Sequence, residues 1–177
     1  MRKFFEDFDF SEFWLDHDHS QKDYIEEPPT DELIASVEEE LGYKLPAAYI
    51  ELMRLHNGGI VAKFCYPLDN DDPNELDEIF INGIMGIGRN KPYSLCGERG
   101  SKFRVDEWEY PDIGVYICDT PSAGHEMILL DYSKCGKNGE PEVFHVDQES
   151  DYHKTFLAKN FEEFIRGLTV FEEDFEE

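Results

Sequence analysis

The chain of 177 residues is 40% hydrophobic and 14% aromatic, which is enough apolar material for one domain with a substantial core and too much for an acidic disordered protein. Sixteen basic residues stand against 41 acidic ones, so the net charge is −25 with histidine neutral. Such a surface repels phosphate backbones and anionic lipids, and we therefore expect no direct binding to nucleic acid or to membranes.

The N-terminal residues 1–22 form an arm in which aromatic and acidic residues alternate. Phe10, Phe13 and Trp14 have the spacing of one helical face, which predicts a helix docked on the body of the protein. Pro28 and Pro29 cannot continue a helix, so residues 23–29 are predicted to be a linker. We place the main domain at residues 23–170 and a second acidic segment, the tail, at residues 171–177.

Two helices are predicted next. Thr30 is a suitable N-cap, and it is followed by apolar residues at spacings of three and four, namely Ile34, Val37 and Leu41. Gly42 can adopt the left-handed backbone conformation that commonly ends a helix. The second helix is predicted to begin at Pro46, a residue suited to a first turn, and to stop at the Asn57-Gly58-Gly59 turn.

The middle of the chain is typical of strands joined by turns. Apolar runs predict strands at 60–66, 79–81, 84–87, 115–118, 127–130 and, as the last strand, 143–146. Residues 67–78 carry many carboxylates and few apolar side chains, which predicts an exposed loop. Asn160 with Glu163 resembles a capping box and begins a final amphipathic helix that runs to Leu168. Helices at both ends of the domain with strands between them indicate an α+β fold with a mostly antiparallel central sheet.

The sequence offers no recognisable enzyme. It has no G-x-S-x-G motif for a nucleophile elbow. Cys118 could meet His125 or His145 in the folded chain, but a thiol on an apolar strand is more often a small buried hydrophobe. The cysteines lack the spacing of zinc or iron–sulfur sites, since they are Cys65, Cys96, Cys118 and Cys135. We therefore expect reduced thiols and no catalytic residues.

The first residues also bear on the compartment. Residues 1–5 are followed at once by Glu6 and Asp7, so the apolar core of a signal peptide is missing. No apolar run approaches the length of a membrane span. With reduced thiols, these features predict a cytoplasmic protein.

Two segments contain residue types that bind metals. Asp16-His17-Asp18-His19 has alternate histidines, but such a polar terminal stretch is usually only solvated. The loop that starts at Asp69 resembles calcium-binding loops through its carboxylates alone, because the fifth and sixth positions hold Pro73 and Asn74. We expect neither a metal nor a cofactor.

Short motifs between about residues 23 and 170 occur in a characteristic order. They are Ile25-Glu26-Glu27, Leu41-Gly42 leading into Leu45-Pro46, Tyr49, Asn57-Gly58-Gly59, Ile113-Gly114 with Asp119, Leu129 to Ser133, Pro141 with Val143, and Phe161 to Leu168. In this order the motifs resemble the SUKH superfamily (Smi/Knr-like domain), which includes bacterial toxin-immunity proteins and a fungal cell-wall-synthesis regulator. The resemblance implies an α+β fold with a central antiparallel sheet packed by helices, and a non-enzymatic, protein-binding function.

The resemblance and the charge together suggest a class of partner. Many bacterial members look like immunity proteins, which bind and neutralise a toxin, often a nuclease. An acidic inhibitor suits a basic toxin because opposite charges accelerate capture. Two alternatives stay open: a regulatory or scaffold domain of the cell-wall-regulator type, and a charge that serves only solubility or a salty environment.

The expected partner-binding residues lie in two places. One is the acidic loop, with Asp69, Asp71, Asp72, Glu75 and Asp77. The other is Trp108 with Glu107 and Glu109, because tryptophan is favoured as a contact anchor and carboxylates around it would meet a basic toxin. A loop that is merely solvated and a tryptophan that is partly buried in the core remain the alternatives.

Overall fold

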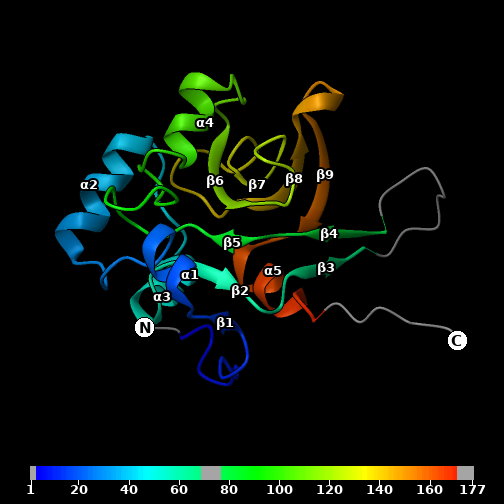
Figure 1. Cartoon of the computed structure of the whole chain (residues 1–177). Helices are drawn as coiled ribbons and strands as arrows, with labels where there is room; N and C mark the ends of the chain where they lie inside the picture. Colours follow the sequence, from blue (N-terminus) through cyan, green and yellow to red (C-terminus); the bar gives the residue numbers. More distant parts are fainter. Residues whose placement is uncertain (1–2, 69–76, 171–177) are drawn as a thin grey trace, which may run out of the picture.

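The computed structural model describes residues 3–68 and 77–170. The helices of this part are α1 (Asp18–Asp23), α2 (Asp31–Leu41), α3 (Ala47–Leu55), α4 (Ser101–Glu107) and α5 (Phe161–Gly167). The strands are β1 (Trp14–Leu15), β2 (Gly59–Val61), β3 (Cys65–Pro67), β4 (Glu78–Phe80), β5 (Gly83–Ile84), β6 (Gly114–Asp119), β7 (Glu126–Asp131), β8 (Glu142–Asp147) and β9 (His153–Ala158). The predicted α+β class is confirmed (Figure 1).

The strands form one large sheet and one small ribbon. The large sheet has the order β1-β2-β5-β6-β7-β8-β9, and each strand is antiparallel to its neighbours. The ribbon of β3 and β4 extends away from the large sheet (Figure 1). The prediction of a mostly antiparallel sheet is confirmed.

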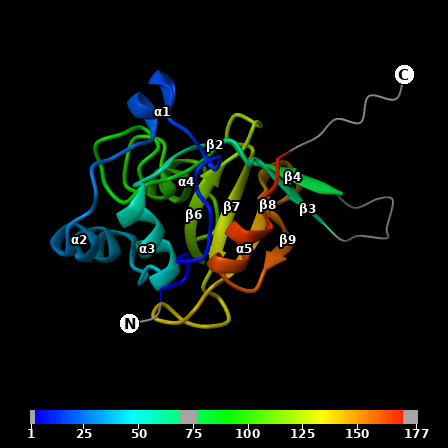
Figure 2. The ribbon, with the colours of Figure 1, turned by 90° about the horizontal axis from the view of Figure 1, so that it is seen from below.

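The core lies between the large sheet and the helices. In α5, Phe161, Phe164 and Ile165 are fully buried, and the helix lies against β8 and β9 (Figure 2). The Asn160 side chain accepts a hydrogen bond from the Glu163 amide at 2.9 Å, which confirms the predicted cap. This amphipathic helix closes the core because its apolar face matches the buried residues of the sheet.

The other helix boundaries follow local signals. The Thr30 hydroxyl accepts from the Leu33 amide at 3.1 Å at the start of α2, and Gly42 ends this helix with φ +83°. Pro46 is the N-cap of α3, so the helix begins one residue later than predicted, at Ala47. These signals can be recognised in the sequence because each links residues three or four positions apart.

Several sequence predictions are wrong. The strand predicted at 60–66 is two strands of different sheets, with a bend at Ala62 between them. The strand at 143–146 is not the last, because β9 follows a tight turn in which Asp151 and Tyr152 have positive φ. Helix α4 has no counterpart among the predicted elements, and no side chain caps its start at Gly100.

The N-terminal arm is packed into the same core but contains no helix at residues 10–14. These residues form turns and the edge strand β1, which pairs with β2. Phe13 is fully buried and Phe5 is 3% exposed. The aromatic residues of the arm therefore pack on the body without forming a helical face.

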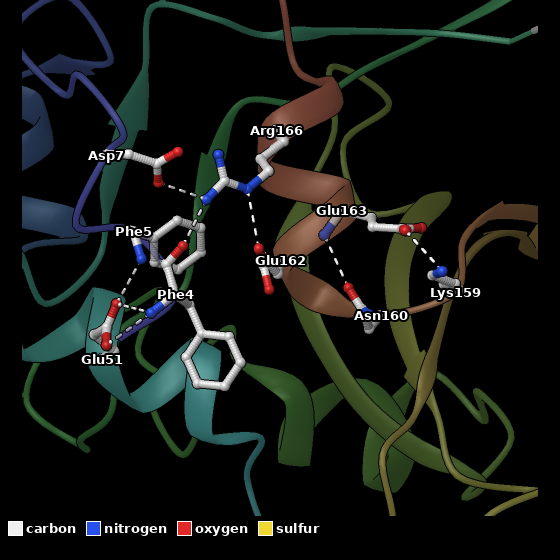
Figure 3. A network of polar contacts seen from close by, with 9 residues as sticks. All are labelled: Phe4, Phe5, Asp7, Glu51, Lys159, Asn160, Glu162, Glu163 and Arg166. Carbon is white, nitrogen blue, oxygen red and sulfur yellow. Dashed lines mark hydrogen bonds and ion pairs between the residues drawn. The ribbon is translucent and has the colours of Figure 1, made fainter. Parts of the chain in front are cut away.

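Two side chains of the body hold the start of the arm. The Glu51 carboxylate on α3 accepts from the Phe4 and Phe5 amides at 2.9 and 2.8 Å (Figure 3). Arg166 on α5 donates to the Phe4 carbonyl at 2.6 Å and to the Asp7 carboxylate at 2.9 Å (Figure 3). The arm therefore contacts the two helices that pack on each other, α3 and α5.

Candidate functional site

The motif residues that carry the family resemblance stabilise the fold from inside. Asn57 is 2% exposed; its Nδ2 donates to the Glu27 and Ile87 carbonyls at 2.8 and 3.0 Å, and its Oδ1 accepts from the Ile87 amide at 2.7 Å. Glu26 is also buried and accepts from the Ser94 hydroxyl at 2.7 Å. These contacts join the segment before α2 to the loop after β5. The role of these residues is structural, because buried polar groups require such partners.

A second buried network surrounds Asp119 at the end of β6. Asp119 is 4% exposed, and its carboxylate accepts from the Tyr24 hydroxyl at 2.8 Å and from the Asn82 side-chain Nδ2 at 3.1 Å. Burial raises the pKa of Asp119, and the hydrogen bonds from Tyr24 and Asn82 oppose that shift. The network ties the end of α1 and the residue before β5 to the central sheet, so it too belongs to the architecture.

The structure separates Cys118 from His145, one of the two histidines considered from the sequence. Ile128 on β7 lies between Cys118 on β6 and His145 on β8 in the sheet register. Cys118 is fully buried, and burial raises the pKa of its thiol well above the usual range. A buried thiol without an electropositive neighbour is unreactive, which agrees with its interpretation as a small hydrophobe.

The Asp16–His19 segment is divided among separate contacts. His17 caps α1 by accepting from the Ser20 amide at 3.3 Å, and His19 lies 3.0 Å from Asp23. Asp16 instead faces His56, with 2.8 Å between the carboxylate and Nε2. Within residues 3–68 and 77–170, no group of three histidine, cysteine, aspartate or glutamate side chains is placed to hold a metal.

The predicted acidic loop falls largely outside the described residues. Asp69, Asp71, Asp72 and Glu75 lie in the segment 69–76, and only Asp77 is described. Asp77 is exposed, and Glu78 next to it begins β4. The described end of the loop is thus attached to the β3–β4 ribbon.

Trp108 is half-buried at the end of α4, between its two exposed neighbours Glu107 and Glu109. The Arg104 guanidinium lies over its ring at 4.9 Å, and the His125 ring meets it edge-on at 5.5 Å. The Trp108 ring is therefore packed as part of the structure on these sides and still reaches the surface. This environment agrees with the alternative of a partly buried tryptophan, and the role of Trp108 as a contact anchor stays a prediction.

The turn between β6 and β7, residues 120–125, connects Trp108 to a pocket that the sequence did not indicate. His125 contacts Trp108 on one side of the turn. On the other side a cavity of about 300 Å³, here called the turn pocket, is lined by Glu78, Ile79, Phe80, Thr120, Pro121, Glu126 and His145. The same turn thus contacts Trp108 through His125 and lines the turn pocket through Thr120 and Pro121.

His145 and Glu126 form the main polar contact in the turn pocket. The His145 Nε2 lies 2.8 Å from the Glu126 carboxylate, and Nδ1 is buried without a hydrogen-bond partner. Burial lowers the pKa of His145, although the Glu126 carboxylate acts in the opposite direction. The histidine is therefore neutral near pH 7 with its proton on Nε2, since a carboxylate can only accept. The sequence does not indicate this contact, because His145 and Glu126 lie on different strands and form no recognisable motif.

Comparison with known families assigns the chain to one of them. The model of the SMI1/KNR4 family (SUKH-1) matches residues 28–167, which include Trp108 and every residue of the turn pocket. The comparison with curated proteins found no match. In the described part of the chain, no helix is both long and apolar enough to cross a membrane. From the extent of the family match, together with the fold, we conclude that the chain belongs to the SMI1/KNR4 family (SUKH-1).

Proposed function

We propose that this chain is a non-enzymatic immunity protein that binds a basic, nuclease-type toxin and neutralises it by occlusion. The observation that carries the proposal is the charge: 41 acidic residues against 16 basic ones in a member of a family that includes immunity proteins. A basic toxin would be attracted by this charge over a distance set by the ionic strength.

The surface around the β6–β7 turn supports the proposal. Glu107 and Glu109 flank the half-buried Trp108, and Asp77 is exposed beyond the turn pocket. A large aromatic side chain with exposed glutamates on both sides of it in the chain is a combination that a basic protein surface would meet. A regulatory or scaffold domain of the cell-wall-regulator type could use the same surface, but it would bind several partners.

The association rate provides a test of the electrostatic part of the proposal. For a catalytically inactive variant of a cognate toxin, we expect the association rate constant to fall about tenfold or more between about 0.02 and 0.3 M salt, because the charges are screened over about 8 Å at physiological ionic strength. Stopped-flow fluorescence across a salt series measures it. An unrelated basic protein of similar size is the control, and it should bind far more weakly. A rate constant that is independent of salt would contradict steering.

A second test addresses occlusion against catalysis. In a co-expression assay, protection from the toxin should survive each single Cys→Ser change and the double change His17→Ala/His19→Ala, because none of these side chains supplies chemistry. Protection should weaken when Asp69, Asp71, Asp72 and Glu75 are all changed to asparagine or glutamine, since each exposed pair contributes only ~0.2–1 kcal/mol and the effects accumulate. Loss of protection in one folded cysteine or histidine variant would point to a catalytic or metal site.

A further inference from the structure

The turn pocket has acidic groups that are not neutralised within the described chain. Glu78 and Glu126 line it, and within residues 3–68 and 77–170 neither forms an ion pair with a lysine or arginine. Three other surface pockets each contain a lysine beside their glutamates, namely Lys3, Lys44 and Lys91. The turn pocket therefore differs from these by offering negative charge without a built-in cation.

His145 does not supply the missing positive charge. Its side chain is 3% exposed, so it is held rigidly in the pocket wall, and its Nε2–H is already committed to Glu126. Because burial lowers the pKa of His145, the imidazole adds no positive charge beside Glu126 near pH 7. The unpartnered Nδ1 adds a buried acceptor that has no donor. The polar lining of this wall thus lacks hydrogen-bond donors that carry positive charge.

Apart from Thr120, the remaining lining is apolar. Ile79 and Phe80 of β4 form one side, and Pro121 of the turn forms another. A guanidinium suits such a lining better than an ammonium ion does: it is planar, weakly hydrated, stacks on aromatic rings and presents five N–H donors in a fixed fork. The stem of an arginine side chain would cover the apolar walls while its head meets the carboxylates.

We propose that the turn pocket binds the guanidinium group of an arginine presented by the protein partner. Glu78 and Glu126 receive the charge, the apolar lining covers the stem of the arginine side chain, and His145 is a positioning residue that orients Glu126. The inference rests on the proposed function in that it assigns one contact of the basic partner. The net charge alone does not say where on the surface the partner binds, and this inference names one place.

A small-molecule titration tests the pocket without any toxin. The probe is N-acetyl-argininamide, followed by NMR of the His145 ring nitrogens and the Glu126 carboxyl carbon in the full chain at physiological salt. N-acetyl-citrullinamide has nearly the same shape without the charge, and N-acetyl-lysinamide has the charge without the fork. We expect saturable shifts with a Kd on the order of 1 mM for the arginine probe, weaker shifts for lysine and none for citrulline.

Two variants sharpen the test. Glu126→Gln removes the charge but keeps an oxygen that can accept from His145, and it should weaken binding of the arginine probe about tenfold, which corresponds to ~1.4 kcal/mol. Glu149→Gln is the matched control, because Glu149 is 71% exposed, pairs with His125 and lies outside the pocket lining; it should leave the affinity unchanged. Equal responses to arginine and citrulline in the wild-type chain, or shifts spread evenly over the surface, would overturn the proposal.

The same variants separate this inference from the proposed function. If the arginine probe binds as expected but no basic toxin is captured, the pocket stands and the immunity function fails. If a toxin binds tightly and Glu126→Gln changes neither its affinity nor the response to the arginine probe, the immunity function stands and the pocket assignment fails.

Discussion

Changing Phe164→Ala should lower the free energy of unfolding by ~3–5 kcal/mol. Phe164 on α5 is fully buried, its ring stacks on Tyr66 at 5.3 Å, and Phe161 lies 6.5 Å away on the same helix. The loss has two parts: the hydrophobic free energy that burial of the ring contributes, and the cost of the cavity left between α5 and β3. Urea unfolding followed by circular dichroism gives the value, and an unchanged m-value would show that the folded state keeps its compactness.

Phe156→Ala is the matched control for this experiment. Phe156 lies on the edge strand β9, is 50% exposed and contacts Phe144 at 5.6 Å between ring centroids. Its truncation removes the same atoms from a half-exposed site and leaves no closed cavity, so we expect a loss of about 1 kcal/mol. If the two variants lost equal stability, the placement of α5 over the sheet would be wrong.

Asn57→Ala should lower the free energy of unfolding by about 3 kcal/mol or more. Alanine leaves the Glu27 carbonyl and the Ile87 amide and carbonyl without the partners that Asn57 supplies. Each buried group without a partner costs roughly 1–3 kcal/mol. Asn138→Ala is the control, because Asn138 is exposed in a turn and should change stability by less than about 0.5 kcal/mol.

Asn57→Asp adds a pH test of the same network. Aspartate can accept from the Ile87 amide but, once ionised, cannot donate to the two carbonyls. Burial would raise its folded pKa above the unfolded value, so the variant should be closest to wild type at low pH and lose stability as the pH rises through the folded pKa. The comparison is the difference in unfolding free energy from wild type at about pH 4 and pH 7. A difference that is independent of pH would mean that Asn57 does not lie in a buried network.

The errors in the predicted elements have a common physical origin. The arm residues Phe10, Phe13 and Trp14 have helical spacing, yet they form turns and a strand because their rings pack on the body. Strand β9 escapes prediction because an edge strand with a mostly exposed face can be polar, as His153 to Thr155 are. Helix α4 is short and begins without a side-chain cap. In each case tertiary contacts outweigh the local pattern.

The site is predictable only in part for a related reason. Trp108 and its flanking glutamates stand out in the sequence because tryptophan is rare and conspicuous among charges. The turn pocket does not, because its lining comes from residues 78–80, 120–121, 126 and 145, which lie in separate parts of the chain. Only the antiparallel register of β7 and β8 brings His145 to Glu126.

Short-range signals in the sequence therefore determine much of this protein. The N-caps Thr30 and Asn160, the terminating Gly42 and the change of hydrophobic period define the α+β class, because each depends on residues a few positions apart. The charge of −25 likewise follows from composition and limits the kinds of partner. The pairing of the arm's strand β1 with β2 and the assembly of the turn pocket depend on contacts between residues far apart in the chain. Their energies come from long-range packing and register, so only the tertiary structure decides them.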